Sequence, residues 1–120
     1  MNRRRPWALA LAGVALAVAV AQSQRTYTTL EAGDHIGETA AVCGNVTGTQ
    51  RSAHGNVFMN LDRQYPNQAF TVYVPSASAD AVGNVSSFDG EDICVTGKIA
   101  LDDHKPEIVV TRKDQISRQK

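Results

Sequence analysis

The sequence lacks every short motif by which a catalytic centre is commonly recognised. It contains no glycine-rich phosphate loop, no HExxH pair and no Gly-x-Ser-x-Gly turn. Its two cysteines, Cys43 and Cys94, are too far apart for a CxxC redox pair. The serine, histidine and aspartate residues also lack the spacing of a catalytic motif. We therefore expect a protein that binds rather than an enzyme, with no catalytic residues, no cofactor and no bound metal.

A surplus of basic residues is also absent. The chain has 12 Lys and Arg against 12 Asp and Glu, and three of the basic residues stand together at positions 3–5. Without the first 21 residues, nine basic residues face 12 acidic ones, which gives a net charge of −3. Proteins that grip nucleic-acid phosphates usually carry a basic stripe. The charge by itself therefore argues against strong phosphate binding.

One long apolar run is present, "WALALAGVALAVAVA" at residues 7–21, directly after the basic start. A basic start, an apolar run and a small-x-small end such as Ala19-Val20-Ala21 are typical of a secretory signal peptide. The run is shorter than the roughly 20 residues of a membrane-spanning helix. We expect residues 1–21 to be a signal peptide cleaved near Ala21, which makes the mature protein periplasmic or secreted. An uncleaved leader that anchors the protein to the membrane is the alternative.

The rest of the chain divides into a polar lead-in at residues 22–30, which we expect to be flexible, one domain at 31–116, and a polar tail at 117–120. Alternation of apolar and polar residues predicts five strands in the domain. They are residues 39–50, 56–62, 69–75, 91–102 and 106–113. Ala79, Val82 and Val85 recur about every three residues and predict a short helix between the third and fourth strands. This order predicts an all-β fold, the five-stranded OB-fold Greek-key barrel, preceded by an N-terminal signal helix.

The first and fourth predicted strands carry a shared pattern that supports their pairing. "VCGNV" (42–46) and "VTGKI" (95–99) both place a glycine inside a strand, where a small barrel needs sharp bends. If Val42 and Val95 share the core face, the neighbouring Cys43 and Cys94 emerge on the same outer face. Paired strands lie about 5 Å apart, a separation that a disulfide can bridge. We expect a Cys43–Cys94 disulfide, in keeping with an oxidising compartment, with two reduced cysteines as the alternative.

The second and third strands present polar and aromatic residues on their outer face. In "VFMNLDRQYPNQAFTVYV" (57–74), alternation directs the aliphatic residues and Phe70 inward, and it directs Phe58, Asn60, Thr71 and Tyr73 outward. An outward ring can stack on an exposed base, which is worth about 1–3 kcal/mol. Asn60 and Thr71 could hydrogen-bond a base edge or a sugar hydroxyl. The alternative is that Phe58 and Tyr73 form a structural cross-strand pair.

The loop after the first strand adds two residues to the candidate ligand site. Arg51 and His54 could approach a phosphate from this loop, as groups able to carry positive charge do at nucleic-acid sites. The predicted ligand-binding residues are therefore Phe58, Asn60, Thr71, Tyr73, Arg51 and His54.

Four segments together resemble a family of bacterial exported OB-fold domains. They are "AGDHIGETAAVCGNV", "FMNLDRQYPNQAFTVYV", "VTGKI" and "KPEIVVTRKDQI". The family is similar to the nucleic-acid-binding OB domains attached to secreted nucleases and helicases. The resemblance implies weak, largely sequence-independent binding of single-stranded nucleic acid or an oligonucleotide-like ligand. A periplasmic or envelope domain that binds protein or glycan, without a nucleic-acid role, is the alternative.

A more distant resemblance concerns "VFMNLDR" (57–63). It is similar to the second strand of the anticodon-binding OB domains of class II aminoacyl-tRNA synthetases, in which an outward Phe stacks on a base. The resemblance implies that Phe58 is the stacking ring and that Thr71 lies near a polar position beside it. This chain has Asp62-Arg63 where that pattern has Arg-Asp.

Overall fold

The computed structural model describes residues 24–119. The predicted signal peptide and its cleavage site near Ala21 lie outside the described residues. None of the helices within 24–119 is long and apolar enough to cross a membrane.

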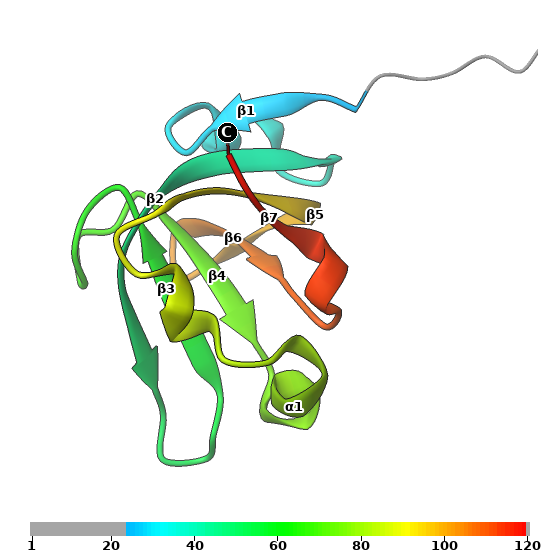
Figure 1. Ribbon diagram of the computed structural model, residues 1–120. Coiled ribbons are helices and arrows are strands. Elements are labelled where there is room, and N and C mark those ends of the chain that lie inside the picture. The colour runs from blue at the N-terminus through cyan, green and yellow to red at the C-terminus, as the bar shows by residue number, and fades with distance from the viewer. Residues whose placement is uncertain (1–23, 120) are drawn as a thin grey trace, which may run out of the picture.

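The described chain folds into a closed barrel (Figure 1). Its strands are β1 (Thr26–Thr28), β2 (Thr39–Arg51), β3 (Val57–Leu61), β4 (Phe70–Val74), β5 (Asp92–Asp102), β6 (Lys105–Val109) and β7 (Ile116–Arg118). The helices are α1 (Ala79–Val82) and short 3-10 turns at Glu31–His35, Ser76–Ser78, Val85–Phe88 and Lys113–Gln115. The strand order is β1-β2-β3-β4-β6-β5-β7, and an additional β2–β5 pairing closes the barrel.

The topology is that of the predicted OB-fold. Strands β2 to β6 supply the barrel, and α1 lies between β4 and β5 at the position predicted for the helix. The β4–β6 pairing is parallel, whereas β3 pairs with β4 and β5 pairs with β6 in the antiparallel sense. The β2–β3 hairpin extends beyond the body of the barrel, and α1 lies near the same end (Figure 1).

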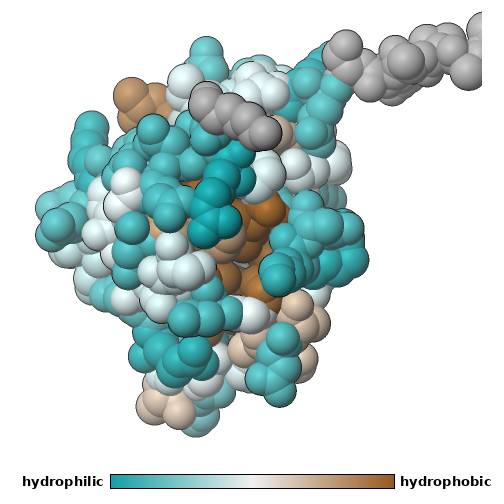
Figure 2. Space-filling model, viewed as in Figure 1, coloured by the Kyte–Doolittle hydropathy of each residue, from teal (hydrophilic) through white to brown (hydrophobic). Residues whose placement is uncertain are grey.

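Alternation along the strands fills the barrel with aliphatic side chains and one ring. The largest fully buried side chains are Phe70, Met59, Leu61, Ile93, Ile99, Ile108, Val42, Val46, Val72, Val74, Val95 and Val110. Removing apolar area from water contributes about 25 cal/mol per Å², so this interior is the main source of stability. Figure 2 shows one face of the result, mostly hydrophilic with apolar surface in a hollow near its middle.

Two strand glycines allow close approach of side chains from other strands. A Cβ at Gly97 would lie 2.6 Å from Ile108 Cγ2, and a Cβ at Gly44 would lie 2.9 Å from Thr29 Cγ2. The bend in β2 lies further along, where the register shifts between Val46 and Gly48. The sequence alone explains Gly44 and Gly97 by the need for strand bending. The structure shows a further reason, which is that other side chains pack closely over both glycines.

Asp62 has structural partners that lie around Gly44. The Asp62 carboxylate accepts hydrogen bonds from the Thr29 hydroxyl at 2.5 Å and from the Asn45 N–H at 2.8 Å. Its backbone is in the left-handed region, with φ of 70°. Asp62 therefore ties the end of β3 to β2 and to the segment after β1.

The disulfide between Cys43 and Cys94 is present, as the sequence predicted. The two residues lie directly opposite each other in the antiparallel β2–β5 ladder, where Val42 also pairs with Val95. The disulfide thus joins two long strands at the seam where the barrel closes. It is compatible with an exported protein.

Both ends of the described chain form strands where the sequence suggested loose segments. Within the expected flexible lead-in, β1 pairs in parallel with β2, and Thr26 lies opposite Ala41. Strand β7 extends into the expected polar tail and pairs with β5, with Ser117 opposite Cys94. Strands β2 and β5 have backbone N–H and C=O groups that the barrel pairings leave free, and β1 and β7 bind to these groups. Such backbone hydrogen bonds need no apolar side chain, so the polar sequences gave no sign of them.

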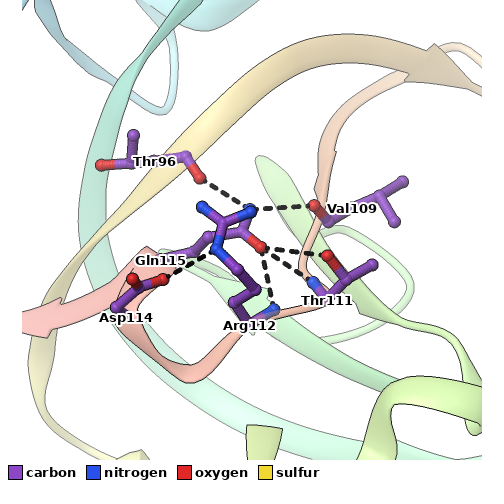
Figure 3. Close-up of polar contacts among 6 residues, drawn as sticks. All are labelled: Thr96, Val109, Thr111, Arg112, Asp114 and Gln115. Atoms are coloured by element: carbon purple, nitrogen blue, oxygen red, sulfur yellow. Dashed lines mark hydrogen bonds and ion pairs between the residues drawn. The ribbon is translucent and has the colours of Figure 1, made fainter. Parts of the chain in front are cut away.

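One buried glutamine holds the chain between β6 and β7 (Figure 3). Gln115 Oε1 accepts from the backbone N–H groups of Thr111 and Arg112 at 2.9 and 3.0 Å. Its Nε2 donates to the carbonyl oxygens of Thr96 and Val109 at 2.9 and 3.2 Å. Both ends of the amide are therefore paired with backbone from β5, β6 and the following turn.

Candidate ligand-binding face

A cavity of about 500 Å³ lies on the outer face of β3 and β4. Its walls come from the end of β2, the loop at residues 62–69 and the β5–β6 hairpin. The lining residues are Gln50, Arg51, Ser52, Phe58, Asn60, Tyr65, Pro66, Gln68, Thr71, Asp102, Asp103, Lys105 and Glu107. A volume of this size is within the range of small-molecule sites, about 300–1,000 Å³.

The structure brings most of the predicted ligand-binding residues to this cavity. Phe58, Asn60, Thr71 and Arg51 line it. Tyr73 is the cross-strand partner of Phe58 and lies beside the cavity rather than in its lining. His54 is exposed in the β2–β3 loop and is not part of the lining either.

Phe58 and Tyr73 form the aromatic pair that was one of two interpretations of this face. Their ring centroids are 5.2 Å apart and the rings are tilted by 38°. Both side chains remain half-buried, so the pair keeps a surface toward solvent. Cross-strand packing and an accessible aromatic surface therefore coexist at this position.

Asn60 and Thr71 point outward as predicted, but they are covered rather than exposed. Only 3% of Asn60 and 8% of Thr71 is accessible to solvent. The loop at 62–69 folds against Thr71, and Gln68 Nε2 donates to the Thr71 hydroxyl oxygen at 3.1 Å. Asn60 Nδ2 donates to Gln50 Oε1 at 3.4 Å. The sequence missed this cover because alternation assigns a face and does not show whether the loop that connects the two strands folds back over it.

The cover also supplies lining residues that the sequence analysis did not select. Tyr65, which is 60% exposed, precedes Pro66 in the loop and adds a second ring to the cavity. Gln68 is 7% exposed and belongs to the same loop. Tyr65 could have been selected from the sequence, because it is an aromatic residue in an otherwise polar turn. Nothing in the sequence marked Gln68 as a lining residue.

The β5–β6 hairpin contributes charge to the cavity. Burial, with the nearby charge of Asp102 as a smaller cause, raises the pKa of Glu107 above its ordinary value. Lys105 Nζ donates to the Gln68 carbonyl oxygen at 3.3 Å and so joins the hairpin to the loop. Among residues 24–119, no group of three His, Cys, Asp or Glu side chains is placed to hold a metal ion.

Comparison with known proteins gives a likeness in fold. No protein-family model matches the sequence, and no curated protein matches it significantly. A solved aspartyl-tRNA synthetase from Leishmania major is 14% identical, with a TM-score of 0.55 over 89% of this chain and 23% of its own. The aspartyl-tRNA synthetase from Entamoeba histolytica is 14% identical, with a TM-score of 0.48 over 92% of this chain and 29% of its own.

The chain thus spans about a quarter of the length of these solved structures. At 14% identity the Leishmania likeness concerns the fold alone, and it agrees with the OB-fold barrel that the strand topology gives.

Proposed function

We propose that this domain is a binding module that takes single-stranded nucleic acid, or an oligonucleotide-like ligand, across the outer face of β3 and β4. Binding is weak and largely independent of sequence. The observation that carries the proposal is the Phe58–Tyr73 pair, which keeps ring surface toward solvent beside the cavity. Stacking on such rings tolerates any base, because every base has a π-face. The fold shared with an aspartyl-tRNA synthetase is in keeping with this class of ligand.

The proposal includes export and a role without catalysis. Residues 1–21 act as a signal peptide, and cleavage near Ala21 releases the domain to the periplasm or the medium. The Cys43–Cys94 disulfide is compatible with that route. The resemblance to bacterial exported OB-fold domains, a family similar to the OB domains of secreted nucleases, supports the same assignment.

A second candidate function follows from the charges around the cavity. Three carboxylates, of Asp102, Asp103 and Glu107, line it against two cations, of Arg51 and Lys105. Carboxylates repel phosphates but accept hydrogen bonds from hydroxyl and amide groups. This observation favours a neutral glycan or a protein of the cell envelope as the alternative ligand.

Salt separates the two candidates. We expect mature protein to bind a labelled single-stranded oligonucleotide and to lose affinity steeply between about 50 and about 200 mM salt, because phosphate contacts release counterions. Fluorescence anisotropy measures this dependence. The Phe58→Ala, Tyr73→Ala double variant should bind at least about tenfold more weakly, since each stacked ring is worth about 1–3 kcal/mol.

The control for this experiment is Leu30→Ala, which truncates an exposed apolar side chain outside the cavity lining. It should bind like the unmodified protein. Absence of oligonucleotide binding at low salt would refute the nucleic-acid proposal. Binding of an envelope glycan or protein that salt leaves unchanged would support the second candidate.

A further inference from the structure

Two buried side-chain oxygens at the cavity have no hydrogen-bond partner. They are Asn60 Oδ1 and Gln68 Oε1, and each exposes less than 1 Å². Both residues line the cavity and both are more than nine-tenths buried. In folded proteins the great majority of buried polar atoms are paired, so two orphans against one cavity call for an explanation.

The free groups of these two amides are acceptors. The nitrogen of Asn60 is directed to Gln50, and the nitrogen of Gln68 is directed to Thr71. What remains on each amide is a carbonyl oxygen, which can only accept a hydrogen bond. A ligand that satisfies both must therefore present N–H or O–H donors.

Most of the charged lining also accepts hydrogen bonds, whereas Arg51 and Lys105 donate them. Asp102 and Glu107 add carboxylates, which accept hydrogen bonds when ionised. Tyr65 and Phe58 add ring surface to the same cavity. A flat group that stacks on a ring and donates from its edge matches this combination of lining residues.

Resting on the proposed function above, we propose that this cavity prefers nucleobases with an exocyclic amino group, cytosine, adenine and guanine, over uracil and thymine. Such an amino group donates to Asn60 Oδ1 or Gln68 Oε1. Uracil and thymine carry a carbonyl oxygen where cytosine carries its amino group, and their one edge donor, N3–H, is flanked by two oxygens that face the acceptor lining unfavourably. The domain would then bind single strands of any sequence and prefer those that place an amino-bearing base in the cavity.

The test compares two oligonucleotides of equal length, oligo(dC) and oligo(dU), at neutral pH and fixed salt. They share the same backbone and differ in the hydrogen-bonding edge of the base. We expect the mature protein to bind oligo(dC) about tenfold more tightly, the discrimination typical of one specific base contact. Equal binding of the two overturns this inference and leaves the proposed function standing. Binding of neither overturns the proposed function itself.

Variants locate the preference. Gln68→Met keeps the length of the side chain and removes its carbonyl oxygen, so it should lower the affinity for oligo(dC) more than the affinity for oligo(dU) and thereby reduce the preference. Gln64→Met, in the same loop but outside the lining of this cavity, is the matched control and should keep the preference. A preference that survives in Gln68→Met and also in Asn60→Leu would overturn the assignment to these oxygens.

A direct readout covers the case in which Asn60→Leu does not fold. The side-chain amide NMR signals of Asn60 and Gln68 in the unmodified protein should shift on titration with free cytidine and stay in place with uridine. Shifts of equal size with both nucleosides would contradict the inference.

Discussion

The two sides of the barrel differ in how completely their polar groups are paired. Beside the β2–β5 seam, a disulfide joins the strands and Gln115 pairs both ends of its amide with backbone. On the β3–β4 side, Asn60 and Gln68 each leave one buried oxygen without a partner. The comparison shows that the buried amide at the seam is fully paired, whereas the two on the β3–β4 side keep free oxygens, which the proposed ligand would use.

Two glutamines show this difference with the same chemistry. Gln115 and Gln68 are almost equally buried, at 8% and 7% exposed. The oxygen of Gln115 accepts from two backbone N–H groups, whereas the oxygen of Gln68 accepts from none. Burial alone therefore does not tell a structural amide from a candidate ligand-binding one.

The largest expected effect comes from breaking the seam. We expect Cys43→Ala with Cys94→Ala to lower the free energy of unfolding by about 4 kcal/mol, because the cross-link restricts a long loop in the unfolded chain. Urea unfolding of oxidised protein and variant measures the difference. The variant should still bind oligonucleotide at a temperature where it is folded. A loss below about 1 kcal/mol would show that the seam holds without its cross-link.

The same substitution at the two glutamines should have unequal effects. Gln115→Leu removes four hydrogen bonds to backbone groups, each worth about 0.5–1.5 kcal/mol net. Thr111 and Arg112 are exposed, so water can pair their N–H groups in the variant. We therefore expect a loss of about 2–3 kcal/mol. Gln68→Leu removes an oxygen that is already unpaired and only one hydrogen bond, from Nε2 to the Thr71 hydroxyl, so its cost should be smaller, about 1 kcal/mol.

Urea unfolding measures both glutamine variants, and Gln119→Leu, at an exposed position, is the matched control. Equal losses at positions 115 and 68 would remove the distinction between the two sides of the barrel.

The smallest effect concerns the anchor of β1. Glu38 accepts hydrogen bonds from the Tyr27 hydroxyl and is paired with His35 Nδ1, both at 2.7 Å. The rings of Tyr27 and His35 stack with centroids 3.8 Å apart. The contact with His35 first, and that with Tyr27 second, hold the pKa of Glu38 at about 2 instead of the ordinary 4.5.

Because the pKa of Glu38 is lower in the folded state, its contribution to stability is fully present above about pH 4.5 and is lost as the pH falls toward about 2. We expect Glu38→Gln to flatten this part of the pH dependence of the melting temperature. Asp80→Asn removes an exposed carboxylate and should leave it unchanged. If the melting temperature of Glu38→Gln depended on pH in the same way as that of the unmodified protein, the proposed stabilising role of Glu38 would be wrong.

Much of the fold could be predicted because period-two alternation depends on neighbouring residues only. Met59 and Val72 are buried, and Phe58 and Tyr73 are paired on the outer face, as that rule requires. Strands β1 and β7 escaped prediction because their polar sequences pair through backbone groups that β2 and β5 offer only after the barrel has formed. The cover over Thr71 escaped for a similar reason, since it depends on where the loop at 62–69 comes to lie.

The sequence by itself determined which side chains fill the barrel, the order of its strands and the pairing of Cys43 with Cys94. These follow from alternation and from the face on which each residue falls. Only the tertiary structure decided that Gln115 is paired and Gln68 is left with a free oxygen. Hydrogen bonding depends on tenths of an ångström between atoms from separate segments, and those distances exist only once the chain has closed.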